Sequence, residues 1–487
     1  AMQHKEMIII GGGQSGITMA LGAAKLGVRV LLIERNDLLS EKCTLAQNIM
    51  RNTFLEYTKA VSVTRSLTHS DLGQAEIDNL FTQVRNGWRR YPRMQIMAML
   101  DDLGVEIWLG EAKAISQNVI AVGGRVVTSK RIVIATGIEE QKPHIPGIET
   151  INYRTCCNIF ERPLAGNKIS IVGGTVLAME YAQSLANLGK EVLLIILPGQ
   201  NKWEKEVFNK IKPFLEEDGV TIYYIDRITE AYRQNKRNIL VCEDDYEHNL
   251  TLDAHEVLFA NTPVPQAIIN IMPLGLALNA NGIWTNARSK TSLQDVYAVG
   301  SVANARTPYF NIEEQTSVAL HNCLIQQPRR AIKARFTVKM INTSPGYIEV
   351  GDLDNKKVKE LKAKLSHYDK PYYGTKNSLE VTWLLRGGSV VGYKAFGSDI
   401  ANVMSNLMHT INPEENLWSF ARTPHIPGTI SHSLRKMVES SQPDSFFPSY
   451  IGALVRISDR ILMLVEKIGI YARRHIAAST RKLRELR

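Results

Sequence analysis

Cysteine is scarce in this chain of 487 residues. There are five cysteines, an odd number with irregular spacing and no CxxC pair: Cys43, Cys156, Cys157, Cys242 and Cys323. Secreted disulfide frameworks use a dense, even set of cysteines, and zinc ribbons use CxxC pairs. The sequence therefore argues against both classes and favours a reducing compartment, with the cytoplasm as the expected location.

Long apolar runs are also lacking, and we expect no leader segment. The chain passes from Met2 almost directly into the short apolar run 7–10, with no small-residue cleavage site behind it, so we expect no signal peptide. The longest uncharged stretch, 257–287, is interrupted by three prolines and makes a poor membrane-spanning helix. We therefore expect a soluble or surface-bound protein.

The overall composition is ordinary, with 44% hydrophobic and 22% charged residues. These values exclude a disordered, collagen-like or multi-span membrane chain, and the length predicts about three domains. The net charge of +10 is uneven, because Ser449–Arg487 holds nine Lys and Arg against three acidic residues. The basic character is local, and we expect no nucleic-acid partner.

Two segments look like copies of one unit. The first runs from the strand 7–10 through a glycine turn and an Ala- and Leu-rich helix to the strand 28–34. The second runs from the strand 169–172 through a similar turn and a helix over 179–188 to the strand 192–196. Strand, glycine turn, helix and strand together form the βαβ unit that binds dinucleotides.

The pattern predicts an α/β fold: two Rossmann-like dinucleotide-binding domains, a C-terminal α+β domain and a terminal helix. The α+β domain begins near residue 336 and contains a β-hairpin formed by 381–385 and 390–394. The expected boundaries are 1–148 and 271–335 for the first dinucleotide-binding domain, 149–270 for the second, 336–441 for the α+β domain and 442–487 for the terminal helix.

The first glycine turn has the features of a pyrophosphate site. Gly11, Gly13 and Gly16 form GxGxxG directly after an apolar strand, and the following helix points its positive end at the turn. Glu34 closes the next strand, 18 residues after Gly16, where a carboxylate accepts hydrogen bonds from an adenosine ribose. These residues favour dinucleotide binding over a simple packing turn.

At this point the chain resembles a known family. The motifs that carry the resemblance are Gly11–Gly16 with Glu34, Ile132–Gly137 leading to Pro143–Gly147, and Asp295–Gly300. In this order they look like the FAD-domain motifs of class I pyridine-nucleotide disulfide oxidoreductases, such as dihydrolipoamide dehydrogenase, mercuric reductase and soluble transhydrogenase. The resemblance covers roughly residues 5–440.

The resemblance implies FAD in the first domain, NAD(P)H in the second, and a homodimer formed by the C-terminal domain. The FAD-binding residues that it implies are Gly11, Gly13, Gly16, Glu34, Ala135, Thr136, Gly137, Gly300 and Ser301. Ser301 departs from the family, which has an aspartate there that holds the ribityl chain of the flavin. A serine hydroxyl still forms hydrogen bonds but carries no charge.

The redox motif of the family is broken. Family members have two cysteines separated by four residues, soon after the ribose carboxylate. Here Cys43 takes the first position and Asn48 the second. Without a second thiol no disulfide can store two electrons beside the flavin, so we expect no dithiol chemistry. Cys43 is either a catalytic thiol or a leftover buried thiol without reactivity.

The second glycine turn is altered as well. Gly173 and Ala178 fit the first and third positions of the motif, but Thr175 adds bulk at the second, where the backbone must approach a pyrophosphate. The residues after the following strand offer no ribose carboxylate. Glu180 matches a family position near the nicotinamide and the flavin, which makes it a catalytic candidate. NAD(P)H binding is doubtful, and the alternative is a nucleotide-free fold retained for packing.

The acid/base motif of the family, His-Pro-Thr-x-Ser-Glu, appears here as 427–432 with Pro427 in place of the histidine and His432 in place of the glutamate. Proline transfers no proton, so the usual dyad is missing. His425 is a substitute candidate, with a partly exposed solvating histidine as the alternative. The adjacent Cys156 and Cys157 have no nearby third ligand, so we expect two half-buried thiols and no metal site.

The terminal segment has apolar residues at helical spacing, with Lys and Arg filling much of the rest. The apolar positions are Ile451, Leu454, Val455, Ile461, Leu462, Val465 and Ile468. This stripe packs either on the protein itself or on its dimer partner. The alternative is a basic amphipathic helix on an anionic membrane, which would place the protein peripherally on the inner membrane face.

The function that we expect is an FAD-dependent oxidoreductase. It would pass electrons between NAD(P)H and a non-disulfide acceptor such as a quinone, a second nicotinamide or another small molecule. The alternative is a catalytically degenerate family member that acts as a membrane-adjacent or partner-binding protein.

Overall fold

A computed structural model of the chain defines the fold. It describes residues 3–199, 202–244, 248–261, 264–266, 268–280, 282–303, 312–325, 330–331, 337–351, 358–365, 378–386, 389–408, 411, 417–441, 458, 460–470 and 472–474.

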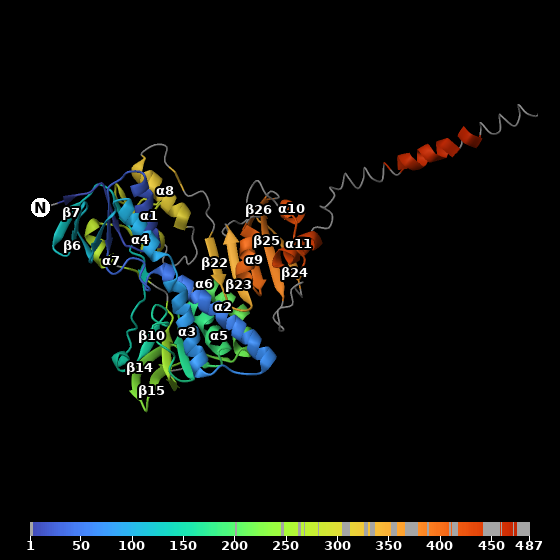
Figure 1. Cartoon of the computed structure of the whole chain (residues 1–487). Coiled ribbons are helices and arrows are strands. Elements are labelled where there is room, and N and C mark those ends of the chain that lie inside the picture. Colours follow the sequence, from blue (N-terminus) through green and yellow to red (C-terminus); the bar gives the residue numbers. More distant parts are fainter. Residues whose placement is uncertain are drawn as a thin grey trace, which may run out of the picture.

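The first nucleotide fold is built on a five-stranded parallel sheet (upper left in Figure 1). Its strands, in spatial order, are β21 (Val296–Ala298), β8 (Ile132–Ile134), β2 (Met7–Ile10), β3 (Val30–Glu34) and β4 (Glu106–Leu109). All four residues of β2 are buried, as expected for a strand covered on both faces. Helix α1 (Gln14–Lys25) follows the glycine turn and packs against α8 (Ile312–Leu324).

Smaller sheets adjoin the first fold. They are a four-stranded sheet of β1 (Gln3–His4), β7 (Arg125–Thr128), β6 (Val119–Val122) and β5 (Ala112–Ser116), and the pairs β9 (Ile138–Glu139) with β18 (Val264–Pro265) and β19 (Leu278–Asn279) with β20 (Gly282–Ile283). Short helices complete this part: α7 (Ile268–Ile271), η2 (Met272–Leu274) and η3 (Gly300–Ala303).

The second nucleotide fold repeats the arrangement (bottom in Figure 1). Its parallel sheet has the order β10 (Tyr153–Thr155), β17 (Glu256–Phe259), β11 (Lys168–Val172), β12 (Glu191–Ile196) and β13 (Val220–Tyr224). Its helices are α5 (Val176–Asn187) and α6 (Lys202–Glu217), and an antiparallel sheet of β14 (Arg227–Gln234), β15 (Arg237–Glu243) and β16 (Asn249–Ala254) adjoins it. Helix α5 begins three residues before the expected 179, because Thr175 caps it.

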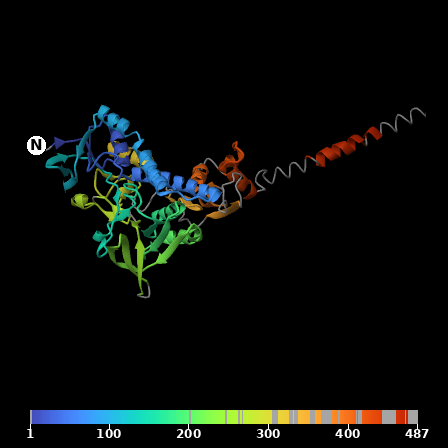
Figure 2. The same cartoon turned by 60° about the horizontal axis from the view of Figure 1, so that its bottom comes forward.

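A long helix connects the two nucleotide folds. Helix α2 (Thr44–Thr68) runs from the first fold along α5 of the second, and it also packs against α3 (Gln74–Arg89) (Figure 2). The ring of Phe54 on α2 lies 5.4 Å from the ring of Phe81 and 5.3 Å from that of Phe160. Two further elements belong to this part of the chain. Helix α4 (Arg93–Asp102) follows α3, and the 3-10 turn η1 (Ile148–Thr150) precedes β10. Buried residues on one face of each parallel sheet belong to one shared apolar cluster, so the two folds pack against each other.

The C-terminal domain is an antiparallel sheet covered by helices. Its strands, in spatial order, are β22 (Thr337–Ile341), β23 (Gly346–Gly351), β26 (Ser389–Gly397), β25 (Leu379–Arg386) and β24 (Lys359–Leu365). The expected hairpin is confirmed, because β25 pairs antiparallel with β26. Helices α9 (Ile400–Leu407), α10 (Leu417–Arg422) and α11 (Ile430–Ser441) supply apolar residues to a core that includes Trp383 and Tyr393.

The terminal segment is helical over 460–470, and its apolar side chains there are exposed (red in Figure 1). Ile451, Leu454 and Val455 of the expected stripe lie outside the described residues. In the part of the chain that the structure describes, none of the helices has the length and apolar character needed to cross a bilayer.

Candidate functional site

The glycine turn of the first fold has the geometry of a phosphate cradle. Gly11 has φ +112°, and a Cβ there would lie 2.2 Å from the Ala135 carbonyl oxygen. A Cβ on Gly16 would lie 1.8 Å from the Gly11 carbonyl oxygen, so α1 sits directly against the turn. Gly13 differs, because a Cβ there would meet nothing within 4 Å. The turn thus presents bare backbone and the amide end of α1 to an open cavity.

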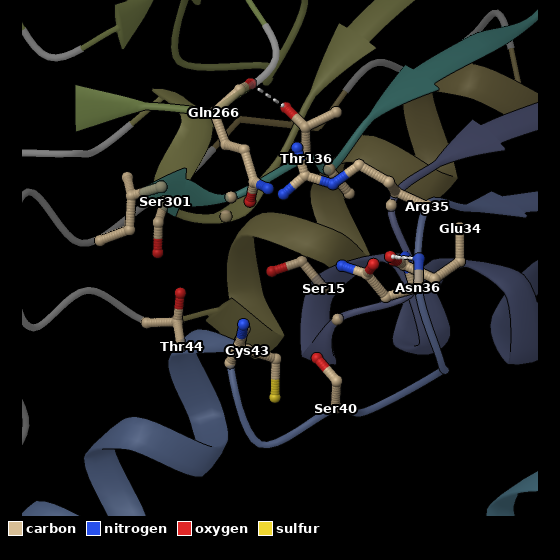
Figure 3. A pocket seen from close by; sticks show the side chains of 18 of the residues that line it. Ser15, Glu34, Arg35, Asn36, Ser40, Cys43, Thr44, Thr136, Gln266 and Ser301 are labelled. Carbon is tan, nitrogen blue, oxygen red and sulfur yellow. Dashed lines mark hydrogen bonds between the residues drawn. The ribbon is translucent and has the colours of Figure 1, made fainter. Parts of the chain in front are cut away.

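Glu34 is fixed by two backbone hydrogen bonds at one end of this cavity. Its Oε2 accepts a hydrogen bond from the Gly12 amide at 2.5 Å, and its Oε1 accepts one from the Asn36 amide at 2.9 Å. Each carboxylate oxygen has a second lone pair for a ribose hydroxyl. Figure 3 shows Glu34 and Asn36 at one end of the cavity and Cys43, Thr44 and Ser301 at the other.

The loop Ala135–Gly137 forms one wall. The Ala135 amide donates to the Ile10 carbonyl at 2.8 Å, which fixes the loop to β2. The Thr136 hydroxyl donates to the Gln266 carbonyl at 2.9 Å, and the Gln266 amide donates to the Gly137 carbonyl at 2.9 Å (Figure 3). The Gln266 side chain also contacts Arg35. Gln266 therefore connects this wall to the segment that follows β18.

Gly300 and Ser301 line the cavity beside this loop, because β21 pairs with β8. Gly300 has φ +81°, and a Cβ there would lie 2.4 Å from the Ser15 hydroxyl oxygen, so only glycine fits. Its amide donates to Gln315 Oε1 at 2.8 Å. Ser301 is half-buried and lines the cavity, where its hydroxyl can bond to a ligand.

Cys43 is a neutral thiol at the start of α2. It caps this helix, with its Sγ accepting from the Ala46 amide at 3.4 Å. Burial raises the pKa of the Cys43 thiol, and the two backbone N–H donors of Leu45 and Ala46 only partly oppose that effect. Asn48 lies one turn further along α2 and lines a second cavity. The described structure thus places one thiol, and no thiol pair, on α2.

The second cavity is next to the first. The residues that line both are Lys42, Thr44, Ile138, Glu139, Glu140 and Cys157. The Cys157 amide donates to Glu140 Oε1 at 2.8 Å. Burial raises the pKa of Glu140, and burial together with the Glu140 charge raises the pKa of Cys157. Burial also raises the pKa of Cys156. Both thiols are therefore protonated at neutral pH, and neither is a ready nucleophile.

Glu180 lies in a buried contact between elements and lines neither cavity as described. Its Oε1 accepts from the Asn342 amide at 2.8 Å, and its Oε2 is 3.5 Å from Arg51 Nε. Gln183, one turn along α5, exchanges two hydrogen bonds with the backbone of Ser344. These contacts attach α5 to α2 and to the loop after β22. Glu180 therefore holds these elements together.

His425 is also held away from both cavities as described. Its Nε2 is 2.8 Å from the Phe420 carbonyl oxygen, which can only accept, so Nε2 carries the proton. Its Nδ1 is 2.6 Å from the Ser431 hydroxyl, which donates to it when the ring is neutral. Both ring nitrogens are thus used within the C-terminal domain.

The turn of the second fold is capped from within. The Thr175 hydroxyl donates to the Ala260 carbonyl at 2.7 Å and accepts from the Ala178 amide at 3.2 Å. Gly173 has φ +141° and packs against the same carbonyl. The NAD(P)H-binding candidates Gly173, Thr175 and Ala178 are therefore together, but they do not form the open cradle of the first fold.

Sequence reasoning did not identify Gln266, Gln315, Arg51 and Asn342. Each meets its partner across more than ten positions of sequence, and no motif marks it. Of these four residues, Arg51 alone could have been noticed in the sequence, because it lies in the segment 49–52 that replaces a family motif.

The donor set of the first cavity fits FAD. Gly13 leaves open space for a pyrophosphate at the amide end of α1, and the Glu34 carboxylate and the Ser301 hydroxyl line the same cavity as hydrogen-bonding groups for the sugar-like hydroxyls of such a ligand. Among the described residues, no group of three or more His, Cys, Asp or Glu side chains is arranged to hold a metal ion.

Comparison with known proteins agrees with this geometry. The family model described as pyridine nucleotide-disulphide oxidoreductase matches residues 5–332. A mercuric reductase from Bacillus cereus is 27% identical over 315 residues, which cover 61% of this chain and 48% of that protein. A dihydrolipoyl dehydrogenase from Acholeplasma laidlawii is 26% identical over 327 residues, which cover 61% and 89%. The chain thus spans about half the length of the mercuric reductase that it matches.

Among solved structures, the HOCl-induced flavoprotein disulfide reductase RclA from Escherichia coli has the same fold. The TM-score is 0.72 at 18% sequence identity, and the match covers 89% of this chain and 99% of that chain. The α/β architecture with Rossmann-like folds is therefore shared with flavoprotein disulfide reductases.

Proposed function

Because the chain belongs to the pyridine nucleotide-disulphide oxidoreductase family, we propose that it is an FAD-dependent oxidoreductase whose electron acceptor is not a disulfide. Members of this family are FAD-dependent flavoproteins that use NAD(P)H. The proposed donor is NAD(P)H, and the proposed acceptor is a quinone, a second nicotinamide or another small molecule.

The observation that carries the proposal is the combination of an open flavin cradle with a single thiol beside it. Gly13 and Glu34 provide the cradle, while Asn48 occupies the position of the second thiol. Bound FAD supplies two-electron redox chemistry. The chain supplies binding through the turn, orientation through Glu34 and Ser301, and a cavity wall that includes the protonated Cys43 thiol.

A direct experiment compares acceptors with the purified flavoprotein. We expect quinones to be reduced, and lipoamide and glutathione disulfide to be left unchanged. The Cys43→Ser variant is the matched control, because it should behave like the wild type toward quinones. Disulfide reduction that depends on Cys43 would contradict the proposal.

A second candidate is a catalytically degenerate scaffold that binds a partner or a membrane. The observations that favour it are the internally capped turn at Thr175 and the structural hydrogen bonds of His425. This candidate expects no reduction of the flavin by NADH or NADPH and no turnover with any acceptor. For the proposed oxidoreductase we expect reduction of the flavin by NADH or NADPH and turnover with an acceptor.

We further propose that the terminal helix binds an anionic membrane surface from the cytoplasm. Its apolar side chains at Ile461, Leu462, Leu464, Val465 and Ile468 are exposed. The segment Ser449–Arg487 carries a net charge of +6. Each Lys or Arg near an anionic bilayer contributes about 1 kcal/mol of binding free energy.

Co-sedimentation with vesicles tests the membrane proposal. The full chain should sediment with vesicles rich in phosphatidylserine but not with neutral vesicles, and added salt should weaken the binding. A variant that ends at Gln442 should stay in solution. Equal sedimentation of both proteins would contradict the proposal.

A homodimer formed by the C-terminal domain is the final part of the proposal, because family members are typically homodimers. Sedimentation equilibrium of the full chain should give twice the monomer mass of 54.6 kDa.

A further inference from the structure

The two nucleotide folds of this chain can be compared residue by residue. In the first sheet, Ile10 of β2 lies opposite Ile33 of β3. In the second sheet, Val172 of β11 lies opposite Ile195 of β12. The glycine turn begins immediately after Ile10 and after Val172. The two sheets therefore have the same register at the turn. Each turn residue of the first fold has an equivalent in the second fold, and so does the residue that ends the second strand.

The first positions of the two turns are equivalent. Gly11 and Gly173 both have positive φ, +112° and +141°. A Cβ on Gly11 would lie 2.2 Å from the Ala135 carbonyl oxygen, and one on Gly173 would lie 2.5 Å from that of Ala260. Both folds therefore have the same tight turn after the first strand. The differences at the other turn positions do not result from a different course of the backbone.

The second positions differ. Gly13 is the N-cap of α1 without any side-chain hydrogen bond, and it faces open space. Thr175 is the N-cap of α5, and its hydroxyl accepts a hydrogen bond from the Ala178 amide. That amide is one of the first-turn N–H groups that a pyrophosphate would bind. The hydrogen bond to the Ala260 carbonyl at 2.7 Å holds the Thr175 side chain in this position.

The remaining two positions also differ, but only the second of them, which corresponds to Glu34, bears on binding. A Cβ at Gly16 would lie 1.8 Å from the carbonyl oxygen of the first glycine, yet Ala178 carries a Cβ at the corresponding place. The dinucleotide-binding motif accepts alanine at this third position, so Ala178 does not by itself exclude a dinucleotide. Glu34 corresponds to Ile196, which is buried and apolar. Ile196 cannot accept a hydrogen bond from a ribose.

We infer that the second nucleotide fold does not hold a dinucleotide, and that Thr175 and Ile196 are the residues that close its cradle. The fold is retained because α5 packs against α2 and its Glu180 and Gln183 hold the loop of the C-terminal domain. This inference concerns the NAD(P)H donor of the proposed function. NAD(P)H would reach the flavin cavity without a pyrophosphate anchor.

Equilibrium titration of the full-length flavoprotein tests the inference. The probes are NAD+ and NADP+, which leave oxidised flavin unchanged, and binding is measured by isothermal calorimetry. We expect the wild-type Kd to be weaker than about 1 mM for both, the upper end of ordinary Michaelis constants. A wild-type Kd near about 10 µM, well inside that ordinary range, would overturn the inference.

Variants at Thr175 and Ile196 test whether these residues prevent the second fold from binding a dinucleotide. Thr175→Ser keeps the capping hydroxyl and should bind as poorly as the wild type. Thr175→Gly frees the amides and should cost little stability, because glycine is well tolerated at a helix N-cap. The double variant Thr175→Gly/Ile196→Glu should bind NAD+ at least about tenfold more tightly than the wild type, a change of 1.4 kcal/mol. Its gain for NADP+ should be smaller, because the new carboxylate repels the 2′-phosphate.

If Ile196→Glu does not fold, Thr175→Gly alone must show a measurable gain for NAD+. No gain in any folded variant that carries Thr175→Gly would overturn the assignment of these two residues. The flavin spectrum of the same samples tests the proposed function separately. A colourless protein that takes up no FAD would refute the oxidoreductase, while the titration would still report on the second fold.

Discussion

Arg51 of α2 and Glu180 of α5 form a buried ion pair, with Arg51 Nε and Glu180 Oε2 3.5 Å apart and side chains only 9% and 0% exposed. The other carboxylate oxygen of Glu180 accepts from the Asn342 amide of the C-terminal domain. One side chain therefore joins three parts of the chain. A buried pair of this kind contributes little net stability as a whole, but removing one partner leaves an uncompensated buried charge.

Replacing Glu180 by Ala should therefore lower the free energy of unfolding by about 3–5 kcal/mol. The flavin content of the folded protein should not change, because Glu180 lines neither cavity as described. Urea unfolding together with the absorbance of bound flavin measures both effects. Glu180→Gln is the matched comparison, because it removes the charge but keeps an acceptor for the Asn342 amide, so the difference between the two variants separates the lost hydrogen bond from the lost charge. A stable Glu180→Ala protein whose flavin no longer accepts electrons would instead show a catalytic role.

Two glycines of the first turn should respond differently to the same added methyl group. Gly16→Ala places a Cβ 1.8 Å from the Gly11 carbonyl oxygen, and overpacking of this kind costs about 1–3 kcal/mol of stability. Gly13→Ala meets no protein atom within 4 Å, so the protein should keep its stability and lose affinity for FAD. Thermal unfolding of the flavin-free proteins and equilibrium dialysis with FAD distinguish the two effects. Unchanged FAD affinity in Gly13→Ala would place the pyrophosphate elsewhere.

Buried thiols should make the protein sensitive to alkali. Burial raises the pKa of Cys242 from 9.0 to about 11 and that of Cys323 from 9.0 to about 12. A thiol whose pKa is raised on folding stabilises the folded state fully below pH 9 and loses that contribution as the pH rises toward the folded value. Each such thiol should lower the stability by about 1 kcal/mol per pH unit in this window.

Urea unfolding between pH 7 and pH 10.5 measures this loss. Cys242→Ala removes one titrating group, so its stability should decline less steeply above pH 9 than that of the wild type. Equal slopes for the two proteins would show that the Cys242 thiol does not contribute.

The first cradle could be predicted from sequence because its determinants are local. Gly11, Gly13 and Gly16 lie within six residues, and their spacing reflects one turn between a strand and a helix. Glu34 closes the next strand of the same βαβ unit. Local backbone requirements of this kind leave a motif that can be recognised without knowledge of the rest of the fold.

The contacts between elements could not be predicted in this way. The Arg51–Glu180 pair joins residues 129 positions apart, and Gln266 meets Thr136 from a segment that follows a different strand. The correspondence of Ile196 with Glu34 needed the register of both sheets, which is set by tertiary packing. His425 was a substitute acid/base candidate in the sequence, and only its hydrogen bonds show how the domain uses it.

An anaerobic reductive titration tests most directly the central claim that a flavin without a disulfide partner does the chemistry. FAD takes up two electrons, and a redox-active disulfide beside it takes up two more. Stepwise addition of dithionite to the purified flavoprotein should bleach the flavin completely after two electrons per FAD, with the same endpoint in Cys43→Ser. Complete bleaching only after four electrons per FAD in the wild type, and after two in Cys43→Ser, would show that Cys43 has a disulfide partner and would contradict the account.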